Sequence, residues 1–196
     1  MINILLSGVG GQGTVLAAKV LAAAAETKGW QVRSAETIGM AQRGGSVVSH
    51  VRMGNEGEVV YSSLLAKGSA DVIIAFEPAE AARVLEYLGP CGTIVSATTP
   101  VQPVTTALAG KGYRLEAILE GIEASLLPTQ RLVKVDDAAL IAAGNRKTLN
   151  TILLAAAINE CTLGIGVDDL REALRACVKP AFVDINLAAV EKVLQG

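Results

Sequence analysis

The chain has 196 residues, of which 51% are hydrophobic, 18% charged and 3% aromatic, and its formal net charge is −2. This composition suits one well-buried domain whose core is built from Ala, Val, Leu and Ile. It excludes a nucleic-acid footprint, because Lys and Arg are scattered, and a membrane span, because aliphatic stretches such as Val20–Ala25 fall far short of roughly 18–20 residues.

The first half of the chain alternates apolar and glycine-rich segments. Ile2–Leu6 is a short apolar run that predicts a buried strand, and the helix formers of Thr14–Lys28, followed by a glycine, predict a helix. The next expected elements are a short strand over Gln31–Ser34, an irregular stretch over Ala35–Gly45, and a hairpin that pairs Ser46–Met53 with Glu58–Tyr61 around a turn at Gly54–Gly57.

The second half predicts two more buried strands, Asp71–Phe76 and Gly92–Ser96, separated by a helix over Pro78–Leu88. Then come a loop over Thr98–Val104, a helix over Leu115–Ser125, a strand over Arg131–Val135, and helices over Asp137–Ala143, Thr148–Thr162, Val167–Ala176 and Ile185–Leu194. This order predicts a single α/β domain over residues 1–196, with a Rossmann-like mixed sheet, a β-hairpin insertion and a helical C-terminal third.

A glycine pattern, G-x-G-x-x-G, lies between the first strand and the first helix and runs from Gly8 to Gly13. Such glycines let backbone N–H groups approach an anion, and the helix N-terminus adds partial positive charge. A dinucleotide fold also has an acidic residue at the end of its second strand, where this sequence has Arg33 and Ser34. Three interpretations stay open: a dinucleotide site, a site for another anion, and a tight turn packed against a neighbouring surface.

The segment Glu36–Ser46 is too polar and glycine-rich for a core element. Arg43, followed by Gly44 and Gly45, places a cation on a loop whose backbone can approach a ligand closely. The alternative is a surface turn with a solvated arginine.

The cysteines Cys91, Cys161 and Cys177 lie far apart and form no C-x-x-C pair, so we expect reduced, buried thiols and neither an iron–sulfur cluster nor structural zinc. His50, the only histidine, falls on the hairpin face that points to solvent or to another subunit, and no acid or nucleophile is obviously paired with it. We therefore expect no catalytic role for His50, and structural or surface roles for Glu36 and Glu77. No basic region precedes an apolar stretch at the N-terminus, which favours a cytoplasmic protein.

Three motifs in order, GVGGQGT at Gly8–Thr14, GMAQRGGSV at Gly39–Val47 and SHVR at Ser49–Arg52, carry a family resemblance. Together they resemble the gamma subunits of 2-oxoacid:ferredoxin oxidoreductases, and most closely the small (beta) subunits of indolepyruvate ferredoxin oxidoreductases. The resemblance continues through Asp71–Pro78, Asn145, Asn150 and Lys179-Pro180, and so covers nearly the whole chain.

The resemblance implies an enzyme that decarboxylates a 2-oxoacid on thiamine diphosphate and Mg, passes electrons through iron–sulfur clusters to ferredoxin, and releases an acyl-CoA. In this family those cofactors lie on the large subunit or subunits. This chain is therefore expected to bind no cofactor or metal alone, to hold no catalytic residue, and to be inactive by itself.

The resemblance also places the domain over the active site, with a part in the coenzyme A site. Contacts to coenzyme A or to a partner subunit are accordingly expected from Gly8, Gly10, Gly11, Gly13, Thr14, Arg43, Gly44 and Gly45. A free-standing dinucleotide-binding oxidoreductase and a purely structural assembly domain are the alternatives.

Overall fold

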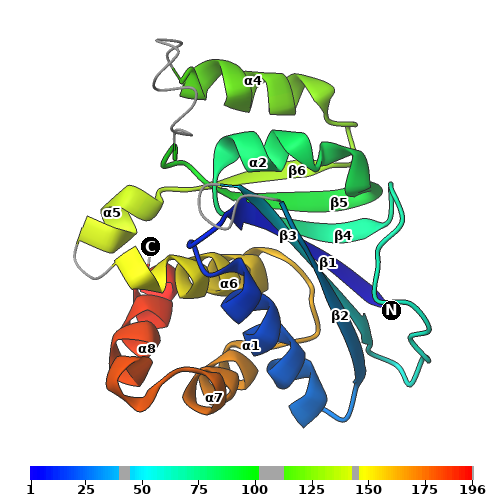
Figure 1. Ribbon diagram of the computed structural model, residues 1–196, viewed down its shortest axis with the longest axis vertical. Helices are drawn as coiled ribbons and strands as arrows, with labels where there is room; N and C mark the ends of the chain where they lie inside the picture. Colours follow the sequence, from blue (N-terminus) through cyan, green and yellow to red (C-terminus); the bar gives the residue numbers. More distant parts are fainter. Residues whose placement is uncertain (40–44, 102–112, 143–145, 196) are drawn as a thin grey trace.

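The computed structural model describes residues 1–39, 45–101, 113–142 and 146–195 (Figure 1). In these residues one six-stranded sheet has the order β2-β3-β1-β4-β5-β6. Its strands are β1 (Ile2–Val9), β2 (Gln31–Ile38), β3 (Ser46–Gly54), β4 (Ala70–Ala75), β5 (Leu88–Ala97) and β6 (Arg131–Val135). Strands β1, β4, β5 and β6 are parallel neighbours, whereas β3 is antiparallel to both β1 and β2. The mixed sheet expected from the sequence is confirmed.

Helices cover both faces of the sheet. They are α1 (Thr14–Thr27), α2 (Pro78–Arg83), α4 (Leu115–Ser125), α5 (Asp137–Ala142), α6 (Leu149–Glu160), α7 (Val167–Cys177) and α8 (Pro180–Gln195), with 3-10 turns η1 (Leu85–Tyr87) and η2 (Arg146–Thr148). Helices α1, α6, α7 and α8 lie on one side of the sheet, and α2 and α4 lie on the other (Figure 1). None of the described helices is both long enough and apolar enough to span a membrane.

The central strands are apolar throughout because they are buried on both faces. In β1, Ile4 and Leu6 pack into the core shared with α1 and α6, whereas Leu5 packs into the core shared with α2. Helix α6 lies inside the larger core, and every residue from Leu149 to Ile158 is buried. The helical C-terminal third is therefore part of the same domain as the sheet, as expected.

The hairpin differs from the one expected. Strand β3 pairs with β2, and the residues Glu58–Tyr61 do not join the sheet. Strand β2 also extends to Ile38, so the expected irregular stretch begins as a strand. The sequence pattern missed this because β2 is an edge strand, and exposed side chains such as those of Glu36 and Thr37 show no apolar alternation.

The segment after β3, residues 58–65, is held instead by side chains of the sheet. The Val60 N–H donates to Gln31 Oε1 at 2.6 Å, and Arg52 Nη1 donates to the Ser62 carbonyl at 3.1 Å. These contacts attach the segment through its own backbone groups, and they do not depend on which side chains it carries.

His50 lies beneath this segment. Its Nδ1 accepts the Leu65 N–H at 3.2 Å, and its ring meets the edge of Tyr87 at a centroid distance of 5.9 Å. The expectation that His50 faces solvent or another subunit is wrong: it is 4% exposed, because residues 58–65 cover that face.

Burial lowers the pKa of His50 below its ordinary value of 6.5. The free energy of unfolding should therefore be unaffected by His50 above pH 6.5, where the ring is neutral in both states. It should fall as the pH drops from there through the lowered pKa, because the unfolded chain takes up the proton first. Urea unfolding across this pH range should show the fall in the wild type and its loss in His50→Asn, whose amide can still accept the Leu65 N–H. A wild-type stability with no such fall would contradict the prediction.

The remaining sequence expectations need small corrections. All three cysteines are free, but Cys91 is exposed and Cys161 and Cys177 are only half-buried, so they are not the buried thiols expected. Helix α8 begins at Pro180 and not at Ile185, because proline fits the first position of a helix. The helix expected over Pro78–Leu88 ends at Arg83, and Leu88 already begins β5.

Candidate functional site

The glycine loop turns the chain from β1 into α1 at the carboxyl edge of the parallel strands. Gln12 closes this turn with both ends of its amide. Its Oε1 accepts the Val9 N–H at 2.6 Å, and its Nε2 donates to the Phe76 carbonyl at 2.9 Å. The loop is thereby fixed to the end of the neighbouring strand β4.

The glycine loop and the segment Glu36–Ser46, both noted in the sequence, contact each other here. The Gly10 N–H donates to the Gly45 carbonyl at 2.9 Å, which joins the glycine loop to the residue before β3. Arg43 and Gly44 lie outside the described residues.

The glycines of the loop have different surroundings. A Cβ at Gly8 would lie 2.8 Å from the Cβ of Phe76, so Gly8 is required by packing. Gly11 and Gly13 have φ of 104° and 89°, a left-handed conformation that favours glycine. A Cβ at Gly11 would meet nothing within 4 Å, so Gly11 borders open space. Thr14 is buried at the start of α1.

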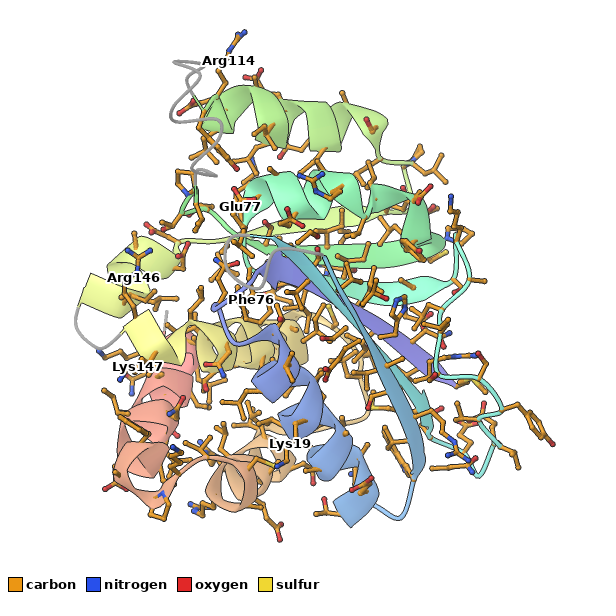
Figure 2. All side chains as sticks on the ribbon, in the orientation of Figure 1. Lys19, Phe76, Glu77, Arg114, Arg146 and Lys147 are labelled. Carbon is orange, nitrogen blue, oxygen red and sulfur yellow. The ribbon has the colours of Figure 1, made fainter. Side chains whose placement is uncertain are left out.

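A cavity of about 350 Å³ opens at this point. It is lined by Gly11, Gln12, Gly13, Leu16, Val101, Arg146, Lys147, Leu149 and Asn150. The structure thus brings Gly11 and Gly13, predicted from the sequence, together with two basic residues that sequence reasoning missed. Asn150 is one of the residues that carry the family resemblance. The two adjacent basic residues shortly before its helix are the feature of the sequence that could have indicated an anion site here. Figure 2 shows Arg146 and Lys147 on the side of the molecule where α5, α6 and α8 meet.

The topology explains why a cavity forms here. Helix α1 follows β1 on one face of the sheet, and α2 follows the neighbouring strand β4 on the other face (Figure 1). Where consecutive connections leave in opposite directions, a crevice forms at the carboxyl ends of the strands, and ligands of open α/β sheets bind there.

The charge around the cavity favours an anion. The N-cap of α1 is Gly13, which makes no side-chain capping bond, and the first turn of α1 contains no acidic residue. The positive end of the helix dipole is therefore not neutralised by the helix itself. The exposed guanidinium of Arg146 and the ammonium of Lys147 add to this positive potential.

Asn150 gives an independent indication of a ligand. The residue is 4% exposed, lies beside Gly13 and lines the cavity, yet its Oδ1 has no hydrogen-bond partner among the described residues. Burying a polar atom without a partner costs about 1–3 kcal/mol, and such atoms are rare in native structures. A donor group of a bound molecule would remove this cost.

Two smaller cavities adjoin this one. A cavity of about 330 Å³ shares Leu16 and Lys147 with it and has mainly apolar walls. A cavity of about 220 Å³ shares Arg146 and also contacts Thr99. Among the described residues, no group of His, Cys, Asp and Glu side chains could hold a metal ion.

Glu77 is a structural residue, as expected. It is buried at the start of α2, where Oε2 accepts the Glu80 N–H at 3.0 Å and Oε1 accepts the Tyr113 hydroxyl. Burial and this carboxylate raise the pKa of Tyr113. Glu80 in turn accepts the Ser46 hydroxyl at 2.5 Å, which ties α2 to the start of β3. Glu36, by contrast, is an exposed carboxylate on β2.

The sequence matches the family described as pyruvate ferredoxin/flavodoxin oxidoreductase over residues 3–196. The chain belongs to this family. It is 36% identical over 191 residues to the indolepyruvate oxidoreductase subunit IorB of Pyrococcus horikoshii, a match that covers 96% of this chain and 92% of the relative. The family resemblance is therefore confirmed.

Two solved structures share the fold of this chain. The gamma subunit of a keto/oxoacid ferredoxin oxidoreductase from Geobacter sulfurreducens matches with a TM-score of 0.70 and 20% identity, over 100% of this chain and 97% of that one. The pyruvate oxidoreductase subunit PORC of Thermotoga maritima matches with a TM-score of 0.72 and 19% identity, over 99% and 95% of the two chains. The expected fold class is confirmed.

The dinucleotide alternative is not favoured. Strand β2 pairs with the antiparallel strand β3, which follows it in the chain, and the described residues show no crossover helix between the two strands. Arg33 and Ser34, by contrast, do not count against it. Strand β2 ends at Ile38, and these two residues are level with Asn3 and Ile4 at the start of β1, away from the strand end where a ribose-binding acid would be expected.

Proposed function

We propose that this chain is the cytoplasmic small subunit of an indolepyruvate-type 2-oxoacid:ferredoxin oxidoreductase, with residues 1–196 forming one gamma-type domain. The observation that carries this proposal is the similarity to IorB subunits at 36% identity over almost the full length of both chains. A second relative, the IorB subunit of Thermococcus kodakarensis, is 34% identical over 190 residues.

In the assembled enzyme a 2-oxoacid is oxidatively decarboxylated to an acyl-CoA, and ferredoxin accepts the electrons. The partner is a large subunit that carries thiamine diphosphate, Mg and iron–sulfur clusters. This chain binds none of these groups alone and contributes no reacting side chain. Its task is to hold coenzyme A.

The cavity at the start of α1 fits the phosphates of coenzyme A. The free N–H groups at the helix N-terminus and the Arg146 guanidinium can bind phosphate oxygens, and a guanidinium does so through two parallel hydrogen bonds. The unpartnered Oδ1 of Asn150 can accept a hydrogen bond from a hydroxyl or amide N–H of the same ligand. Gly11 and Gly13 allow the phosphates to approach the backbone.

We propose that Arg43, Gly44 and Gly45 also contact this ligand. The proposal is supported by the hydrogen bond from the Gly10 N–H to the Gly45 carbonyl, which holds Gly45 next to the glycine loop. Gly8 and Thr14 contribute by packing, since both are buried.

The test is reconstitution of the chain with its large subunit and an assay of indolepyruvate-dependent ferredoxin reduction in the presence of coenzyme A. Either subunit alone should be inactive. Arg146→Ala should raise the KM for coenzyme A on the order of ten-fold, because a charge-assisted hydrogen bond contributes about 1.5–3 kcal/mol, while the KM for the 2-oxoacid stays unchanged.

Arg114→Ala is the matched control, because Arg114 is an exposed arginine at the start of α4, far from Arg146 (Figure 2). Turnover by this chain without the large subunit would refute the proposed subunit role. Equal coenzyme A kinetics for both arginine variants would refute the proposed site.

A further inference from the structure

A cavity of about 390 Å³ lies at the amino ends of the parallel strands, where Figure 1 marks the N-terminus. It contacts the first residues of β1, β4 and β6, and therefore lies at the opposite edge of the sheet from the glycine loop. Two of the three cysteines of the chain, Cys91 and Cys161, line it together with Thr93, Arg131 and Glu160. The proposed function uses none of these side chains.

Cys161 is held in this cavity at the end of α6. Its sulfur is hydrogen-bonded to the side chains of Thr93 and Arg131, and the Arg131 Nη2 also donates to the Glu160 carbonyl at 2.8 Å. Burial raises the pKa of the Cys161 thiol above its ordinary value of 9.0, and the nearby guanidinium offsets only part of this effect. Because the thiolate is the form that attacks an oxidant, Cys161 is poorly suited to react with one first.

Cys91 approaches the same place from β5, and it is exposed, so it is the thiol that a dissolved oxidant meets first. A Cβ on the neighbouring Gly92 would lie 2.6 Å from the Cδ1 of Leu88, a residue of the core on the α2 side. Because side chains alternate along a strand, Cys91 and Thr93 point to the other side, toward the end of α6. Positions two apart on a strand are separated by about 6.6 Å, so Cys91 lies one such step from the residue that contacts the Cys161 sulfur.

Both cysteines lie where the backbone can adjust. The register between β4 and β5 shifts between Leu88 and Thr93, so Cys91 belongs to an irregular part of its strand. Cys161 is the C-cap of α6 and has an extended backbone. A small movement at these two positions can bring their Cα atoms to the roughly 4.4–6.8 Å that a disulfide requires, without breaking the helix or the regular part of the sheet.

We propose that Cys91 and Cys161 form an oxidation site, in which a peroxide oxidises Cys91 and the two cysteines then close an intramolecular disulfide. In the first step the Cys91 thiolate attacks a peroxide oxygen and the O–O bond breaks. Cys91 becomes a sulfenic acid, and with hydrogen peroxide the leaving hydroxide takes up a proton as water.

In the second step Cys161 loses its proton to solvent and attacks the Cys91 sulfur, so that the S–O bond breaks and a second water leaves. The Arg131 guanidinium stabilises the Cys161 thiolate during this attack. Two thiols are thereby oxidised to one disulfide, and hydrogen peroxide is reduced to two waters. The disulfide can be reduced again by a dithiol, whereas an unprotected sulfenic acid is oxidised further to a sulfinic acid. Cys161 therefore protects the exposed thiol.

The experiment treats the reduced full-length chain with hydrogen peroxide, alkylates the remaining thiols, and maps the peptides by mass spectrometry without reduction. Trypsin places the three cysteines in three different peptides. The thiols of Cys91 and Cys161 should be lost together, at a rate that does not depend on chain concentration, and their peptides should be found linked. Cys177, which is half-buried on α7 outside this cavity, should remain a thiol. Dithiothreitol should restore both oxidised thiols.

Three variants separate the two steps. Cys161→Ser should leave Cys91 as a sulfenic acid that dimedone labels, in a larger fraction of chains than in the wild type. Cys91→Ser should keep the Cys161 thiol intact over the time in which the wild type is oxidised. Cys177→Ser is the matched control and should behave as the wild type.

The proposal is overturned if wild-type Cys91 accumulates sulfenic acid as it does in Cys161→Ser and no linked peptide forms. It is also overturned if the only disulfides join two chains, which a non-reducing gel shows as a dimer. Oxidation of Cys161 in Cys91→Ser as fast as in the wild type would contradict the assignment of Cys91 as the residue that reacts first.

Discussion

Gly11→Leu should raise the dissociation constant of coenzyme A for the assembled enzyme on the order of ten-fold or more. Gly11 lines the cavity at the start of α1, and a Cβ there would meet no protein atom within 4 Å. The new side chain would therefore occupy the space proposed for the phosphates of coenzyme A. The left-handed φ of 104° adds a backbone cost of about 1–2 kcal/mol. Isothermal calorimetry with coenzyme A and urea unfolding of the same sample measure the two effects separately.

Gly29→Leu is the control for this backbone cost. Gly29 follows α1 with a φ of 74°, and a Cβ there also meets nothing within 4 Å, but the residue lies at the other end of the helix from the cavity. Both variants should lose similar stability, and only Gly11→Leu should lose affinity for coenzyme A. Equal affinities in the two variants would count against a ligand at the glycine loop.

Gly8→Ala should lower the free energy of unfolding by about 3 kcal/mol, at the upper end of what overpacking of a core usually costs. The added methyl group would lie 2.8 Å from the Cβ of Phe76 and 2.9 Å from the Cγ2 of Thr14. The Phe76 Cβ cannot move away easily, because Phe76 is fully buried and its N–H donates to the Ser7 carbonyl at 2.8 Å. Strands β1 and β4 would have to separate.

Gly121→Ala makes the same chemical change where space is free. Gly121 lies inside α4 with no atom within 4 Å of its Cβ position, so the substitution should stabilise the chain by up to about 1 kcal/mol through helix propensity. Urea unfolding of both variants gives the comparison. A Gly8→Ala chain as stable as the wild type would show that the loop is not closely packed.

The sequence predicted those elements whose pattern is determined locally. Strand β6 and helix α4 have the bounds expected, and β1 was recognisable because a strand buried on both faces is a continuous apolar run. The edge strand β2 was recognised only in part, since its exposed polar residues carry no such pattern. The prediction that β3 forms a hairpin with Glu58–Tyr61 was wrong for the same reason, because β3 pairs with β2 instead.

The candidate site was only half visible in the sequence. Gly11 and Gly13 follow a known pattern at a helix start and could be predicted from local spacing. Arg146 and Asn150 lie more than 130 residues further on and reach the cavity only because α6 packs beside α1 after the sheet is complete. No local sequence pattern predicts that these residues come together. The sequence also cannot predict that the Oδ1 of Asn150 is buried without a hydrogen-bond partner among the described residues, because that depends on the elements that surround it.

In the segment over residues 58–65, the groups that attach it to the sheet differ from the side chains that it exposes to solvent. The sheet holds it through backbone groups that every non-proline residue possesses, and its side chains Val60 and Leu65 are buried against the protein. Val59 and Tyr61 point outward, and Tyr61 is 91% exposed. Homologous chains can therefore change the exposed positions of this surface without changing its shape. The residues that preserve the shape are the glutamine, arginine and histidine of the strands beneath it, together with the two buried side chains of the segment.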